Sequence, residues 1–192
     1  DKYQFASYIP FFYPDFHPYY LDCTKNLCQD NEEFSRNCDD VFLQKRQNGQ
    51  NPTVICEIIR NDSIDDFIHF INTNGVPIGK TDVRYSIFET NIFLYQSKVT
   101  LLDYAAFFGA IQIFTYLLLN GCNLRDETWF FAIHGNNTEI IRILEDKQLL
   151  PPDNDYVRCL LEAIKCHHND LARYFYSNHL DDNEDLLTIM QI

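Results

Sequence analysis

The sequence predicts an all-α protein made of about four helix pairs stacked into a solenoid, with an irregular, aromatic-rich N-terminal segment. The clearest pair lies at 100–124. Its small residues Ala105 and Ala106 allow neighbouring helices to approach closely. Gly109 suits the tight turn between the two helices, and Asn120-Gly121 favours the end of the second one. A single helix pair cannot bury its apolar face alone, so the pattern implies further copies beside it.

Three sets of equivalent apolar positions place these copies in register. Successive copies are offset by 27 and 31 residues, close to the period of about 33 expected for one class of helical repeat. An earlier copy begins 47 residues upstream, and an insertion at 80–99 accounts for the longer gap. The three sets are Ala105, Ala132 and Ala163; Ile113, Ile140 and Leu171; and Leu117, Leu144 and Phe175. The predicted pairs lie near 53–79, 100–124, 126–150 and 154–180.

The remaining segments divide the chain at about residue 51. Nine aromatic residues fall within the first twenty, and prolines recur there every fourth residue, which forbids a regular helix. The segment 1–51 is therefore predicted either to cap the first pair or to bind a partner. The array fills 52–192, and 183–192 forms a partial repeat or a cap. Two apolar runs in the insertion 80–99 suggest either a β-hairpin or an irregular loop folded onto the first pair.

Charge and cysteine content exclude several classes of partner. The net charge of −13 argues against nucleic acid and against anionic membranes, and no apolar run approaches the roughly 20 residues that span a bilayer. Acidity either favours a basic protein or peptide partner by long-range attraction or only keeps the chain soluble. Seven cysteines, an odd number, suit reduced thiols in a cytoplasmic protein better than a disulfide framework.

Candidate chemical sites are weak in this sequence. Zinc sites usually pair ligands about two to four residues apart, and neither available group of Cys and His residues has such pairs in a suitable context. No nucleophile elbow, phosphate-binding glycine loop or calcium loop occurs. We therefore expect no catalysis, no cofactor and no metal. The two groups considered are His17, Cys23, Cys28 and Cys38, and Cys159, Cys166, His167 and His168.

The repeats resemble the ankyrin family, and more narrowly a divergent ankyrin-like domain of unknown function that is multiplied in some protists. The resemblance covers about 52–180 and rests on Ile59-Arg60-Asn61-Asp62, on Tyr104-Ala105-Ala106-Phe107-Phe108-Gly109-Ala110 and on the segment from Ala132 to Ile141. The usual Thr-Pro-Leu-His opening is present only as Thr100-Leu101-Leu102-Asp103. Because the histidine helps to connect adjacent turns in the family, its replacement predicts shortened loops in place of β-turn fingers.

The resemblance implies a protein-interaction scaffold that binds through first helices and the loops between repeats. We expect a monomer that binds a protein or peptide partner without catalysis. The alternative is a structural or regulatory module that packs against a neighbouring domain of its own protein. The positions that the resemblance favours for partner contacts are Arg125, Asp126, Glu127, Asp153, Asn154 and Asp155, together with Tyr85 and Phe88 of the insertion.

Overall fold

The computed structural model describes residues 11–12, 40–96 and 98–180. Most of the predicted N-terminal segment, its Cys and His group, and the predicted cap at 183–192 therefore lie outside the described residues. The chain divides into two compact units. One contains residues up to Thr53 together with Arg84–Lys98, and the other contains Val54–Val83 and the residues from Val99 onward.

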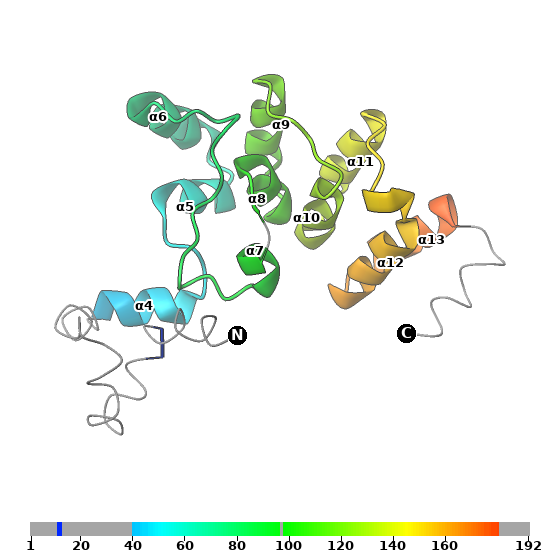
Figure 1. Ribbon diagram of the computed structural model, residues 1–192, viewed down its shortest axis with the longest axis horizontal. Helices are drawn as coiled ribbons and strands as arrows, with labels where there is room; N and C mark the ends of the chain where they lie inside the picture. The colour runs from blue at the N-terminus through cyan, green and yellow to red at the C-terminus, as the bar shows by residue number, and fades with distance from the viewer. Residues whose placement is uncertain (1–10, 13–39, 97, 181–192) are drawn as a thin grey trace. The chain divides into compact units, whose positions relative to one another are not determined.

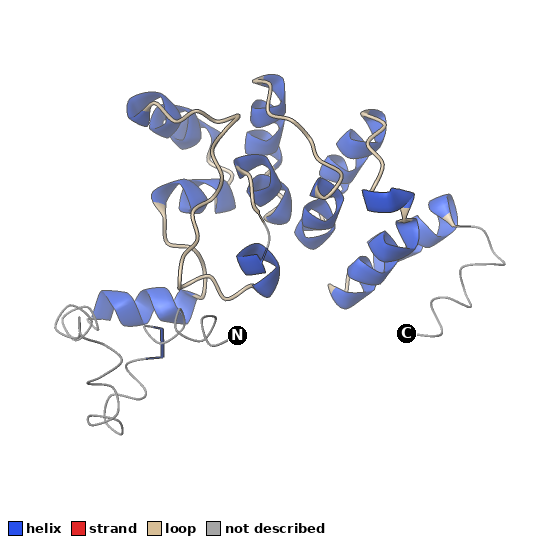
Figure 2. Cartoon of the chain, viewed as in Figure 1, coloured by secondary structure: helices blue, strands red, loops and turns tan. Residues whose placement is uncertain are grey.

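The second unit consists of four consecutive helix pairs (Figure 1). All regular secondary structure of the described residues is helical, which confirms the all-α prediction (Figure 2). The first helix of each predicted pair begins within two residues of the predicted start of that pair. The pairs are α5 (Val54–Arg60) with α6 (Ile64–Asn74), α8 (Leu101–Phe107) with α9 (Ile111–Leu119), α10 (Thr128–Gly135) with α11 (Thr138–Asp146), and α12 (Tyr156–Lys165) with α13 (Asn169–His179).

Helices of neighbouring pairs pack against one another in sequence order. The first helices α5, α8, α10 and α12 contact each other in succession, and the second helices α6, α9 and α11 do the same. The alanines predicted to face neighbouring helices, Ala105, Ala132 and Ala163, are fully buried. The other two predicted sets are buried as well, with Leu171 the most exposed member at 6 %. The register taken from the sequence is therefore the register of the core.

The turn between the two helices repeats the same backbone conformation in every pair. A residue with positive φ stands two positions before each second helix, and the spacings between these residues are 47, 27 and 31, as in the sequence register. Glycine occupies this position only in the second pair, because Asn and Asp tolerate the left-handed region better than other side chains. The four residues are Asp62, Gly109, Asn136 and His167.

Side chains at these turns connect each pair to the next. The carboxylate of Asp62 accepts hydrogen bonds from the backbone N–H groups of Gln112 and Ile113 at the start of α9. Asn137 donates to the main-chain oxygen of Gly109 at 3.0 Å. These contacts satisfy backbone groups at helix ends that have no partner within their own helix.

Close backbone approach at the same turns requires small residues. A Cβ added to Gly135 would lie 2.0 Å from the main-chain oxygen of Ala106, so α8 and α10 meet there without room for a side chain. Gly109 has φ of +65°, and a Cβ added to it would lie 3.0 Å from the main-chain oxygen of Gly135. Both glycines are therefore fixed by contact between adjacent pairs.

The largest side chain of the core joins the last two pairs. Trp129 is fully buried, and its ring makes edge contacts with Tyr156 and Phe175 at 6.0 Å between ring centres. Its indole N–H donates to the main-chain oxygen of Leu149 at 3.0 Å, so burial leaves no polar group unsatisfied.

The first unit contains α4 (Asp40–Asn48), α7 (Ile92–Gln96) and the chain around them. The β-hairpin alternative for 80–99 is wrong, since the described residues there form turns and α7, and the only pairing is a single bridge from Asp82 to Thr100. Residues 84–98 instead belong with the segment that precedes the first pair. The buried side chain of Asn51 donates to the main-chain oxygen of Arg84, and its N–H donates to Glu89.

Candidate partner-binding surface

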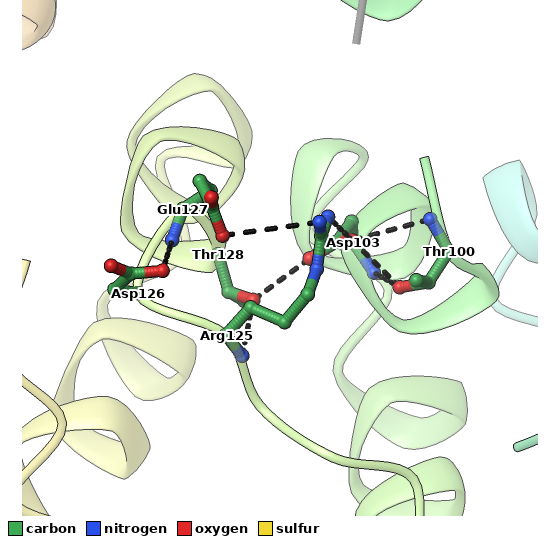
Figure 3. A network of polar contacts seen from close by, with 6 residues as sticks. All are labelled: Thr100, Asp103, Arg125, Asp126, Glu127 and Thr128. Atoms are coloured by element: carbon green, nitrogen blue, oxygen red, sulfur yellow. Dashed lines mark hydrogen bonds and ion pairs between the residues drawn. The ribbon is translucent and has the colours of Figure 1, made fainter. Parts of the chain in front are cut away.

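A buried carboxylate organises the surface at the start of α8 and α10. Asp103 is 1 % exposed and lies in the first turn of α8 (Figure 3). It forms a capping box with Thr100: the Thr100 hydroxyl accepts from the Asp103 N–H, and the Asp103 carboxylate accepts from the Thr100 N–H. The pair satisfies two backbone donors that have no partner inside the helix.

The same carboxylate reaches the next helix pair. Its Oδ1 accepts from the hydroxyl of Thr128 at 2.8 Å, and its Oδ2 accepts from Nη2 of Arg125 at 2.5 Å. The Thr128 hydroxyl in turn accepts from the Arg125 N–H. Asp103 thus links the start of α8 to the loop before α10 and to the first residue of α10. A capping box was readable from Thr100-x-x-Asp103, whereas its partners on α10 were not.

Arg125 has a structural role in addition to its predicted place on the binding surface. Its side chain is 32 % exposed, and it pairs with Asp103 and, at 3.8 Å, with Glu127. Burial disfavours its charge, but the hydrogen bond and negative charge of Asp103, with smaller effects from Glu127 and Asp82, raise its pKa above the ordinary value of an arginine. The guanidinium therefore stays charged and is held in place.

The two residues that follow Arg125 place acidic side chains on the surface. Asp126 and Glu127 are both exposed, Glu127 with 54 % of its side chain accessible. The Asp126 carboxylate accepts the Glu127 N–H at 3.0 Å, which orients this short loop directly before α10.

The second predicted loop presents acidic groups in the same position before α12. Asp153 and Asn154 are exposed and both have positive φ, and Asp153 lies in a short 3₁₀ turn. Asp155 is half-buried because it caps α12 by accepting from the Arg158 N–H. Two of the three predicted residues in this loop are therefore accessible, and the third stabilises the helix.

The two loops lie on neighbouring helix starts. Near the starts of α10 and α12, the guanidinium of Arg158 lies 5.1 Å from the ring centre of Phe130 and 3.6 Å from the carboxylate of Asp153. Both helices therefore begin on the same side of the array, and exposed carboxylates from two loops share that side. Such an arrangement can attract and orient a cationic group.

The predicted residues of the insertion belong to the other unit. Tyr85 is 51 % exposed, and its ring contacts Tyr95 edge to face at 5.0 Å. Phe88 is half-buried against Phe42 of α4, which makes it part of the packing of that unit.

A mixed cluster at the opposite ends of α10 and α12 was missed by the sequence reasoning. His134 Nε2 lies 3.0 Å from Oε1 of Glu162, and His134 Nδ1 lies 3.4 Å from Sγ of Cys166. The Glu162 pKa is lowered by hydrogen bonds from His134 and Lys165 against the opposing effect of burial. Burial and the charge of Glu162 raise the Cys166 pKa.

Of the group that the sequence considered for metal, only Cys166 belongs to this cluster. Cys159 is fully buried, and burial raises its pKa to about 12. His168 contacts the main-chain oxygen of His134 at 3.3 Å, and His167 occupies the left-handed turn position.

The chain matches no protein-family model, no curated protein and no solved structure. Within the part of the chain that the structure describes, no helix has the length and apolar character needed to cross a membrane.

Proposed function

We propose that this chain is an ankyrin-like repeat scaffold that binds a protein or peptide partner. One observation carries the proposal: the first helices of successive pairs contact one another, and the loops before α10 and α12 display exposed carboxylates from adjacent positions. A rigid row of such loops offers a pre-ordered surface, so binding costs little conformational entropy.

The partner is proposed to carry basic groups. Arg125 and Arg158 are paired with acidic side chains, and Asp126, Glu127 and Asp153 are exposed on the same side of the array. With a net charge of −13 over the whole chain, attraction of a cationic partner is strengthened at long range and weakened by salt.

The side chains of this surface are proposed to bind a partner and to catalyse no reaction. Asp103 is buried in hydrogen bonds and makes the loops rigid, while the exposed carboxylates of Asp126, Glu127 and Asp153 are accessible to a partner's Lys or Arg. Arginine suits these carboxylates best, because its planar fork can contact two oxygens at once.

Proximity labelling in the source cell tests this function. The full chain serves as bait beside the variant Ala105→Arg, which places a charge in the contact between first helices. The proposal predicts specific partners that are enriched in basic segments and absent with the variant. Equal labelling by both baits, or an empty set of partners, would contradict it.

A further inference from the structure

The side-chain cluster at the ends of α10 and α12 combines three different metal-ligating groups. One ring nitrogen of His134, one carboxylate oxygen of Glu162 and Sγ of Cys166 all lie within 4.8 Å of one another. Glu162 and Cys166 are four residues apart on α12 and its C-terminal cap, so they share one face, and α10 supplies His134. All three residues are half-buried, which leaves an approach from solvent.

We propose that His134, Glu162 and Cys166 bind one Zn²⁺ ion and leave a fourth position for water. Tetrahedral zinc with imidazole, carboxylate and thiolate ligands needs ligand atoms roughly 3.4 to 3.6 Å apart. Nε2 of His134 lies 3.0 Å from Oε1 of Glu162, and Nδ1 of the same ring lies 3.4 Å from Sγ of Cys166. Both distances are at or slightly below this range, so a turn of the imidazole ring that presents one nitrogen to both partners converts the hydrogen-bonded cluster into a coordination site.

The surroundings of the cluster favour a cation. It lies at the C-terminal ends of both α10 and α12, where the helix dipoles place partial negative charge. Phe107 stacks on the His134 ring with 4.9 Å between ring centres, and Lys165 binds Oε2 of Glu162 at 3.2 Å. These contacts hold the ring and leave Oε1 directed at the cluster, as outer contacts commonly do around zinc ligands.

Zinc suits the cluster better than chemistry by the free thiol. A nucleophilic cysteine needs a thiolate at neutral pH, and both burial and Glu162 disfavour the thiolate of Cys166. A bound zinc ion replaces the thiol proton and removes that penalty. This site goes beyond the proposed function, because it connects two neighbouring pairs whether or not a partner binds, and it revises the expectation that the chain holds no metal.

The test uses the full reduced chain and Zn²⁺ or Co²⁺ as the only probes. Calorimetry with Zn²⁺ is expected to give one site per chain, and Co²⁺ is expected to produce a thiolate-to-metal charge-transfer band. Cys166→Ser and Glu162→Gln each weaken Zn²⁺ affinity at least about tenfold. Cys166→Ser is also expected to abolish the Co²⁺ charge-transfer band. Circular dichroism serves to check that both variants keep their helices.

Two control variants decide the assignment. Cys122→Ser removes a buried thiol outside the cluster, and His69→Ala removes an exposed imidazole on α6, so both are expected to keep affinity and band. No Zn²⁺ binding by the wild type, or binding that survives Cys166→Ser and Glu162→Gln unchanged, would overturn the proposal. Because partner binding is measured in a separate experiment, the absence of Zn²⁺ binding would not contradict the proposed scaffold function.

Discussion

Removing the Asp103 carboxylate tests how neighbouring pairs are held in register. In Asp103→Ala, the helix loses its capping box, Thr128 loses its acceptor, and Arg125 loses its buried counter-ion. A cap contributes about 1 kcal/mol and a neutral hydrogen bond about 1 kcal/mol. A charged hydrogen bond contributes about 1.5–3 kcal/mol.

The expected loss of unfolding free energy in Asp103→Ala is smaller than the sum of these three contributions. Arg125 is 32 % exposed and regains water when its partner is removed, so its contribution falls to the lower end of the range. We expect Asp103→Ala to lower the free energy of unfolding by about 3 kcal/mol. Asp103→Asn keeps the size and one acceptor oxygen and is expected to cost about half as much.

Urea unfolding of the full chain, followed by far-ultraviolet circular dichroism, measures these differences. Asp126→Ala serves as the matched control, since it removes an exposed carboxylate from the adjacent loop and is expected to change stability by no more than about 0.5 kcal/mol. A loss below about 1 kcal/mol for Asp103→Ala would refute the view that this network holds α8 against α10.

Three further substitutions probe the core, a turn and the effect of pH. Ala105→Arg forces a charge into a fully buried contact, so cooperative thermal unfolding is expected to disappear, whereas an unchanged melting curve would contradict the packing. Gly135→Ala places a Cβ against the main-chain oxygen of Ala106 and is expected to cost about 1–3 kcal/mol in urea; equal stability would show that the two pairs can separate there freely. The folded-state pKa of Glu162 lies below its ordinary 4.5, so its contribution to stability is present above pH 4.5 and is lost as pH falls through the folded pKa. Urea midpoints of wild type should therefore fall more steeply with acid than those of Glu162→Gln, and parallel curves would argue against this contribution.

The array was predictable because its apolar positions recur at fixed offsets. Equivalent small side chains at Ala105, Ala132 and Ala163 must face neighbouring helices if the pairs stack, and all three are fully buried. The positive-φ residues of the turns between paired helices recur at the same offsets as the apolar positions. Only Gly109 could be predicted to adopt this left-handed conformation, because it is the only glycine among them. Periodicity thus specified both the elements and their register.

Contacts between repeats were harder to predict because they depend on which side chains meet across a turn. The side chain of Asp103 contacts Arg125 and Thr128 only when α8 and α10 are packed together, so the sequence around Asp103 does not reveal these partners. His134 and Cys166 are 32 residues apart, close to the offset of 31 between their repeats. If the polar residues are aligned in the same register as the apolar ones, His134 and Cys166 fall at nearly equivalent positions of neighbouring pairs, which predicts that they lie close together.

The insertion shows where local pattern misleads. Two apolar-aromatic runs on either side of Glu89-Thr90-Asn91 suggested either a hairpin or an irregular loop, and the hairpin does not form. Glu89 accepts the N–H of Asn51, and the Thr90 hydroxyl donates to the oxygen of Gly49. Contacts with a segment about 40 residues earlier replaced strand pairing, and no local propensity reveals such a partner.

We propose that exposed carboxylates on the loops before α10 and α12 bind a basic partner. Proximity labelling with the bait Asp126→Lys/Asp153→Lys tests it most directly, beside Asp170→Lys, which reverses an exposed carboxylate at the start of α13. Melting curves first establish that both variants remain folded. The loop variant is expected to lose the wild-type partners, whereas Asp170→Lys is expected to keep them. Partners retained by the folded loop variant, or lost equally from both, would contradict it.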